Sequence, residues 1–277
     1  MNQSVRMILL ALLLAGGCDQ AGPASRRDGI VSLTPAGTDL LVAMGLGDRV
    51  VGVSPFEANE DLRRRLPKAG DYLHIDWETL AELRPAYLVV QGKRDRLPPG
   101  TREKCDALDI RAVILQIDRL ADIEAAVEQL GASISGATGG PALLQSLRAR
   151  EQKVKQHAPK ARVPTLLAFS DSGTQTVGRE TFIDDALTLA GGENVVTAAG
   201  YPTLDAEKLA SLRPKVAFLL LPGGTGEGVA RAEAALRTAG LSADVPVHAI
   251  TQPDALLPGT SAWRLAEMMA AHLRDGS

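Results

Sequence analysis

A short segment that occurs twice constrains the fold of this chain more than any other feature. Residues 76–85 (DWETLAELRP) align with residues 205–214 (DAEKLASLRP) at a constant offset of 129, and seven of the ten positions are identical. Tyr72 and Tyr201, four residues before each copy, obey the same offset. Because two copies are too few for a solenoid, the repeat predicts a molecule made of two similar lobes.

Each copy of the repeat has the pattern of a short helix that leads into an apolar strand. Asp76 and Asp205 are placed to cap the N-terminus of this helix. Glu78 and Glu207 fall in its first turn, where the helix dipole favours a carboxylate, and this electrostatic match is by itself one explanation of the pair. The Arg-Pro dipeptide is expected to end the helix, since a residue before proline avoids the α region.

Strand-like and helical patterns alternate on both sides of one long charged stretch. In the first half, β-rich runs fall at Ile30–Leu33, Val50–Val53, Tyr87–Val90 and Ala112–Leu115, and helical spacing falls at Thr38–Met44, Trp77–Leu83, Glu103–Leu108 and Ile123–Ile134. A second strand–helix series follows at Thr165–Phe169, Phe182–Leu189, Leu209–Leu212, Val216–Leu221, Val229–Ala239, Val247–Ile250 and Ser261–Leu273. The alternation predicts an α/β fold with parallel sheets.

The charged stretch between the two series is predicted to form a single long helix. Pro141 stands where a helix favours its first turn, and one narrow apolar stripe runs along the helix through Leu143, Leu144, Leu147 and Val154. Such a helix is suited to lie across two lobes.

The first 17 residues have the pattern of an export signal: Arg6, then the apolar run Met7–Leu14, then small residues before Cys18. The run is too short to span a bilayer. Its end resembles a bacterial lipobox, with Ala15 at the usual leucine position, so Cys18 is the predicted lipidation site; a plain secretory signal is the alternative. Residues 18–27 read as a flexible tether. Cys105 then remains as a single thiol, which predicts no disulfide and no cysteine-based metal site.

Composition and motifs argue against two other classes of protein. The 30 basic and 33 acidic residues are interspersed, with a net charge of −3, so no basic stripe favours nucleic acid. The sequence has no dinucleotide fingerprint after the first strand, no P-loop and no nucleophile elbow. A Rossmann-type enzyme therefore stays an alternative only because a Ser/His/Asp set can meet in space. We predict that the protein is not an enzyme.

Five further phrases occur in a fixed order along the chain. They are Ser32-Leu-Thr-Pro35-Ala-Gly-Thr38-Asp39, residues 45–53, residues 66–70, residues 177–183 and residues 190–195. Together with the repeat and the lipobox, they resemble the periplasmic binding proteins of ABC importers for cobalamin, iron–siderophores and haem. The resemblance covers residues 28–273, and Asp39 stands where the family usually has glutamate.

The resemblance implies two Rossmann-like lobes with central parallel sheets, at residues 28–136 and 162–277, joined by one long helix within residues 137–161. It also implies that Glu78 and Glu207 pair with arginines on the permease subunits of an importer, whose separate ATPase supplies the energy. The protein is then expected to be a monomer, held by a lipid anchor in the periplasm or at the extracytoplasmic membrane surface. A surface lipoprotein that sequesters its ligand is the alternative.

For the ligand, the resemblance implies a pocket with aromatic walls. Phe56, Tyr72 and Tyr201 fall at three ligand-contacting aromatic positions of the cobalamin-binding members, whereas two others fall at Gly92 and Gln175. Aromatic rings hold large flat ligands by stacking and by apolar area. The chain has only nine aromatic residues, so three at these positions favour cobalamin as the transported ligand. For Phe56, packing against its own lobe is the alternative.

Haem and ferric siderophores are the other ligands of this class. A haem carrier uses an axial Tyr or His, and Tyr72 and His74 lie together on one loop. Siderophores carry negative charge and are met by basic side chains. The basic candidates are Lys93, Arg94, Arg96 and Arg179. No resident cofactor or metal is expected.

Overall fold

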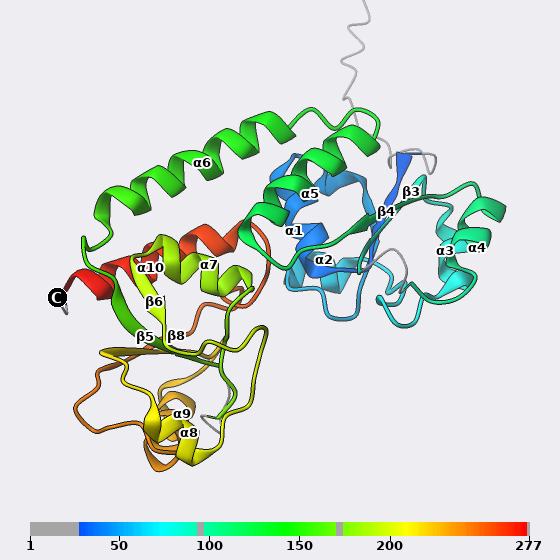
Figure 1. Cartoon of the computed structure of the whole chain (residues 1–277). Coiled ribbons are helices and arrows are strands. Elements are labelled where there is room, and N and C mark those ends of the chain that lie inside the picture. Colours follow the sequence, from blue (N-terminus) through cyan, green and yellow to red (C-terminus); the bar gives the residue numbers. More distant parts are fainter. Residues whose placement is uncertain (1–27, 93–96, 170–173, 276–277) are drawn as a thin grey trace, which may run out of the picture.

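Two four-stranded parallel sheets form the centres of two lobes (Figure 1). The computed structural model describes residues 28–92, 97–169 and 174–275. The strand orders are β2-β1-β3-β4 and β6-β5-β7-β8, so the two lobes have the same topology. This equivalence agrees with the two lobes that the repeat predicted, and the α/β fold with parallel sheets is confirmed.

The first lobe places its helices around a sheet whose central strands are buried. Its strands are β1 Ile30–Ser32, β2 Val50–Val53, β3 Tyr87–Gln91 and β4 Arg111–Leu115. Its helices are α1 Pro35–Ala43, the short 3-10 helix η2 Gly47–Arg49, α2 Glu60–Arg65, α3 Trp77–Leu83, α4 Thr101–Ala107 and α5 Leu120–Ser133. All three residues of β1 are buried, as expected for a parallel strand covered on both faces.

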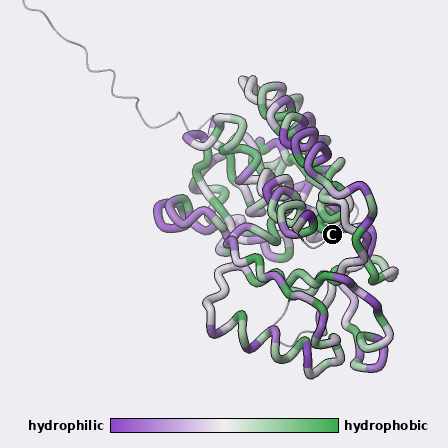
Figure 2. Tube along the Cα trace, turned by 90° about the vertical axis from the view of Figure 1, so that its left-hand side faces the viewer, coloured by the Kyte–Doolittle hydropathy of each residue, from purple (hydrophilic) through white to green (hydrophobic). Residues whose placement is uncertain are grey.

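The second lobe repeats this arrangement. Its strands are β5 Val163–Ala168, β6 Gly192–Asn194, β7 Val216–Leu220 and β8 Val247–Ile250. Its helices are α7 Phe182–Leu189, α8 Ala206–Ser211, α9 Gly226–Thr238 and α10 Ser261–Asp275. All five residues of β7 are buried, and hydrophilic residues concentrate on the outer helices of the molecule (Figure 2).

One long helix, α6 Gly140–His157, crosses from the first lobe to the second (Figure 1). Its 18 residues correspond to a length of about 27 Å at the usual rise. Leu144, Leu147 and Val154 are buried along its inner face, and Leu143 is half-buried beside them, so the predicted apolar stripe faces the core. The helix packs on α5 of the first lobe and on α10 of the second.

Two polar contacts also join the lobes directly. Asp39 on α1 accepts hydrogen bonds from the backbone N of Thr260 (2.6 Å) and from its hydroxyl (3.1 Å). Asp185 on α7 accepts from Nε of Arg119 (2.8 Å) and from the backbone N of Leu120 (3.0 Å). The two lobes are therefore connected by α6 and by the hydrogen bonds of both carboxylates.

The structure contains short elements that the sequence pattern did not predict. The helix α2 was missed because only one of its residues, Leu62, is buried, so no apolar periodicity marks it. The strand β6, Gly-Glu-Asn, has no β-branched residue. By contrast, β2, α3, α7 and β8 have the predicted bounds.

Candidate ligand cleft and docking surfaces

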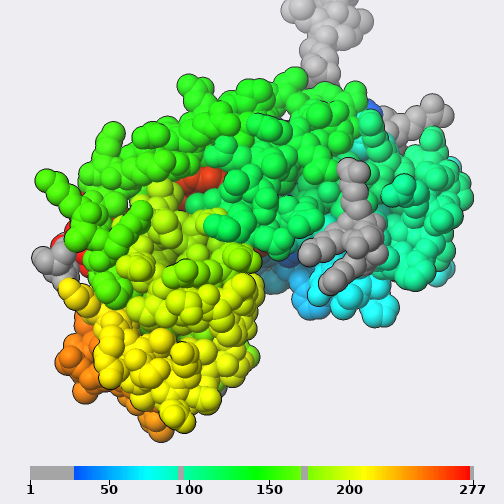
Figure 3. Space-filling view, in the orientation of Figure 1, coloured from blue at the N-terminus to red at the C-terminus, as the bar shows by residue number. Residues whose placement is uncertain are grey.

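The two lobes enclose an open angle on the side away from α6, visible in the space-filling view (Figure 3). Loops that follow the carboxyl ends of the parallel strands border this side, where open α/β sheets bind their ligands. The predicted residues Phe56, Tyr72 and Tyr201 all lie in loops rather than in helices or strands.

Most large apolar side chains on the described surface belong to these loops. The exposed ones are Val42, Phe56, Tyr72, Leu73 and Tyr201. Of these, Phe56 is 70% exposed, Tyr72 54% and Tyr201 52%. Exposed aromatic rings lose their contact with water when a flat ligand covers them, which is favourable. Leu73 was not among the predicted site residues, although it is adjacent to Tyr72.

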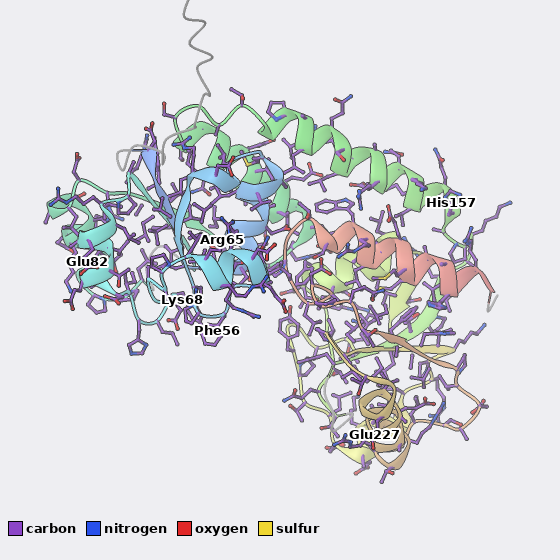
Figure 4. The ribbon with its side chains drawn as sticks, turned by 180° about the vertical axis from the view of Figure 1, so that it is seen from behind. Phe56, Arg65, Lys68, Glu82, His157 and Glu227 are labelled. Atoms are coloured by element: carbon purple, nitrogen blue, oxygen red, sulfur yellow. The ribbon has the colours of Figure 1, made fainter. Side chains whose placement is uncertain are left out.

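Phe56 projects from a tight turn between β2 and α2. The backbone N of Phe56 donates to the hydroxyl of Ser54 (3.1 Å), and the backbone N of Glu57 donates to the Ser54 carbonyl (3.1 Å). Figure 4 shows Phe56 at the edge of the first lobe that borders the open angle. Because most of the ring is exposed, Phe56 does not fill the interior of its own lobe.

Tyr72 lies at the tip of a narrow turn that the Asp71 side chain closes. The Asp71 carboxylate accepts hydrogen bonds from the backbone N of Leu73 (2.8 Å) and of His74 (2.9 Å), and the backbone N of Asp71 donates to the His74 carbonyl (2.8 Å). Gly70 has φ +98°, and a Cβ there would lie 2.1 Å from the His74 carbonyl oxygen. Glycine is therefore required, and Tyr72, Leu73 and His74 are all left exposed.

Tyr201 is held by a backbone ladder and faces the other lobe. The backbone N of Thr176 donates to the Pro202 carbonyl (3.0 Å) beside it. Its ring packs edge-on against Phe169, with centroids 5.7 Å apart. Burial raises the pKa of the Tyr201 hydroxyl, and the charge of Asp118, which belongs to the first lobe, raises it further. Sequence reasoning missed Phe169 and Asp118; the position of Phe169 just after β5 is the one signal that pointed to it.

The repeated segments form α3 and α8, at the outer parts of the two lobes (Figure 1). Asp76 accepts from the backbone N of Thr79 (3.0 Å), and Asp205 accepts from the backbone N of Lys208 (2.7 Å), so both predicted caps are confirmed. Hydrogen bonds from Thr79 lower the pKa of Asp76. Glu78 and Glu207 are exposed in the first turns, one on each lobe.

Several other predictions concern residues outside these loops. The signal at residues 1–17, Cys18, the tether, Lys93, Arg94 and Arg96 lie outside the described residues. Arg179 is exposed and its backbone N bonds to the Ala198 carbonyl (2.8 Å) beside the Tyr201 loop. Cys105 is a buried free thiol.

The described part of the chain has neither a candidate metal site nor a membrane-spanning helix. Over these residues, no group of three or more His, Cys, Asp or Glu side chains is arranged to hold a metal ion. A search of the same residues finds no helix with the length and apolarity needed to cross a membrane.

Comparison with known proteins identifies the class. Residues 30–238 match the family described as periplasmic binding protein, and the chain belongs to this family. Its members are substrate carriers of the periplasm rather than enzymes, and they work with the permeases of ABC importers.

Proteins that are similar to this chain have two kinds of ligand in their names. The chain is 28% identical over 217 residues to the vitamin B12-binding protein of Vibrio vulnificus, covering 75% of this chain and 76% of the relative. A periplasmic haem-binding protein from Pseudomonas aeruginosa has a similar fold (TM-score 0.73, 21% identity, 89% and 92% of the two chains). So does the periplasmic vitamin B12-binding protein of Vibrio cholerae (TM-score 0.72, 21% identity, 90% and 97%).

Proposed function

We propose that this protein captures a corrinoid, cobalamin or a close analogue, between its lobes and delivers it to an ABC importer. The observation that carries the proposal is the exposure of Phe56, Tyr72 and Tyr201 on loops of both lobes, in a chain with few aromatic residues. Stacking of these rings on a large flat ligand replaces their contact with water. The similarity to vitamin B12-binding proteins supports the same ligand class.

A retained-ligand screen tests the ligand directly. The purified protein is mixed separately with cyanocobalamin, haemin and ferric siderophores, desalted, and examined by absorbance. The proposal predicts that cyanocobalamin co-elutes with the protein at a stoichiometry near one. Retention of haemin or a siderophore without retention of any corrinoid would refute it.

Haem is the second candidate, favoured by one feature of the Tyr72 turn. Tyr72 and His74 are both exposed there, two residues apart, and either side chain is a suitable axial ligand to haem iron. A haem complex would show an intense Soret band that changes in Tyr72→Phe or His74→Ala. Cobalamin bound by stacking would be insensitive to loss of the Tyr72 hydroxyl, so Tyr72→Phe separates the two ligands.

Delivery is proposed to depend on Glu78 and Glu207, one exposed carboxylate on each lobe. Exposed ion pairs between these carboxylates and arginines of the permease would set the register of docking and steer the encounter more than they add affinity. Reversing both charges, Glu78→Arg with Glu207→Arg, should abolish uptake by the reconstituted importer while ligand binding is retained. Glu82 on α3 and Glu227 on α9 are exposed carboxylates that offer a matched control pair (Figure 4). Unchanged uptake in the first pair would favour a protein that sequesters its ligand.

Attachment to the membrane is proposed to occur through a lipid on Cys18. The sequence before this residue has the order of a basic, an apolar and a small-residue region. Cys18→Ser should release the protein from the membrane fraction of expressing cells. Continued membrane association of this variant would refute the lipid anchor.

A further inference from the structure

A small cavity lies between the lobes next to the loop that carries Phe56. Its volume is about 210 Å³, which is ample for a small polar group such as a carboxamide together with water. Its polar lining comes from Thr38, Asp39, Glu57, Asn59 and Asp254. The first four belong to the first lobe and Asp254 belongs to the second, so both lobes form the cavity, and its lining residue Glu57 directly follows Phe56 in the chain.

The lining consists mainly of hydrogen-bond acceptors. Three of these five residues are carboxylates, and no lysine or arginine lines the cavity among the described residues. Burial raises the pKa of Asp39; the hydrogen bonds from Thr260 oppose this, and the charge of Asp254 adds to it. Asp254 itself pairs with Arg264. The cavity therefore favours a group that donates hydrogen bonds over one that carries negative charge.

Glu57 is the residue in this lining that its surroundings leave unsatisfied. It is 2% exposed, and Oε1 accepts from the backbone N of Asn59 (2.8 Å). Its Oε2 is buried and has no hydrogen-bond partner within the described part of the chain. The nearby Arg63 donates instead to the backbone carbonyl of Glu57 (3.2 Å), and its other contact is the exposed Glu60 at 3.7 Å.

Burying a carboxylate without a cation costs free energy. The hydrogen bond to the Asn59 backbone therefore does not by itself explain why this residue is a glutamate. Glutamine would keep the bond to the Asn59 backbone at lower cost, because its side chain also has an acceptor oxygen. A ligand group that donates a hydrogen bond to Oε2 would stabilise the buried carboxylate and explain why a glutamate stands here. The described residues hold no group of three metal ligands, and an organic N–H group is the donor that matches a single free carboxylate oxygen.

We propose that Glu57, together with Asp39, forms a subsite that accepts N–H groups from carboxamide side arms of the ligand and disfavours carboxylates. This inference rests on the proposed function, since a corrin ring carries carboxamide arms at its periphery. Haem carries propionates at the periphery of its ring, and ferric catecholate and carboxylate siderophores are anionic. The subsite would thus separate the ligand classes that the aromatic loops, which stack on any flat ring, do not distinguish.

The test compares ligands that differ by a single amide. Cyanocobalamin and its monocarboxylic acid isomers, in which one peripheral amide is hydrolysed, are titrated calorimetrically against wild type, Glu57→Gln and the control Glu60→Gln. Wild type and the control should bind cyanocobalamin about tenfold more tightly than at least one isomer, as expected for loss of a hydrogen bond to a charged group. In Glu57→Gln this ratio should fall to about threefold or less. An unchanged ratio overturns the subsite.

Failure of the corrinoid proposal would be visible separately, as absence of cyanocobalamin binding to wild type. The subsite is then tested with haemin or the ferric siderophore that does bind. Glu57→Gln should raise the affinity for that anionic ligand about tenfold, and Glu60→Gln should leave it unchanged. Equal affinities in all three proteins overturn the subsite. If Glu57→Gln does not fold, Asp39→Asn changes the charge of the same lining and takes its place.

Discussion

Replacing Gly178 by alanine should displace Tyr201 while the rest of the second lobe stays folded. Gly178 lies in the segment that pairs with the Tyr201 loop. A Cβ at this position would lie 2.0 Å from the carbonyl oxygen of Ala198 and 3.2 Å from that of Gly200. Both are backbone atoms held in a ladder, so the side chain cannot turn away and the two segments must separate.

The cost follows from the hydrogen bonds that separation breaks. They run from Gly178 N to Gly200 O, from Arg179 N to Ala198 O and from Gly200 N to Arg179 O, each 2.8 Å long. At a net worth of about 0.5–1.5 kcal/mol each, their loss lowers the free energy of unfolding by about 1.5–4.5 kcal/mol. Tyr201 then loses its fixed position, and ligand affinity should fall by about tenfold or more.

Gly200→Ala provides the matched control in the same ladder. Gly200 has φ +74°, and a Cβ there would meet no atom within 4 Å. Its cost is conformational, about 1–2 kcal/mol, and the ladder is retained. Urea unfolding followed by circular dichroism measures both stabilities, and titration with cyanocobalamin measures both affinities. If Gly178→Ala binds as well as Gly200→Ala, the ladder does not position Tyr201 and the reasoning is refuted.

Three other outcomes are expected. Replacing both Tyr72 and Tyr201 by alanine should weaken corrinoid binding by about 2–3 kcal/mol, a rise in Kd of about 30- to 160-fold. Asp205→Ala should lower the free energy of unfolding by about 1 kcal/mol, whereas Asp205→Asn, which retains the cap, should not. The pH dependence of stability should contain opposite contributions from His248 and Asp39. Burial, and secondarily the charge of a neighbouring histidine, lowers the pKa of His248. Its contribution is therefore present above about pH 6.5 and lost as the pH falls, because the unfolded chain takes up the proton first. Burial raises the pKa of Asp39, so its contribution is present near pH 4 and lost as the pH rises toward neutrality.

Each of these outcomes has a measurement that can contradict it. Calorimetry that gives the same corrinoid affinity after loss of both tyrosines would exclude this pocket. Equal urea midpoints for the alanine and asparagine variants at Asp205 would show that the cap contributes nothing. Stability is measured between pH 4 and 8 in wild type, His248→Phe and Asp39→Asn. The difference from wild type should slope in opposite directions for the two variants, and slopes of the same sign would disprove the assignments.

Much of the fold was predictable because the signals for it are local. The capping aspartates and the leucines that follow them lie within one short window, so α3 was predicted with its observed bounds. The second copy departs from its twin at the end: α8 ends at Ser211 with Leu212 extended, whereas α3 ends with Arg84 in a left-handed conformation. The packing around each helix decides where and how it ends, because the Arg-Pro dipeptide is identical in the two copies.

The site was predictable only in part. The offset of the repeat drew attention to one tyrosine in each lobe, and both are exposed on loops. The burial of Glu57 was not predictable, because a glutamate between an exposed phenylalanine and an exposed alanine reads as a surface residue. Glu57 is held in the turn that follows β2 and lines a cavity that residues of both lobes form, and neither feature leaves a pattern in neighbouring residues.

Short patterns in the chain were enough to predict two similar lobes, an aspartate-capped short helix in each, and one long helix that joins them. Helix-capping hydrogen bonds and apolar periodicity involve residues only a few positions apart, so a short stretch of sequence is enough to predict them. Long-range packing is what brings Asp39 to Thr260 across 221 positions, and Asp118 near enough to Tyr201 for its charge to act on the hydroxyl. Such contacts depend on how α6 and α10 pack between the lobes. This packing fixes the position of one lobe relative to the other, and with it the cleft between them.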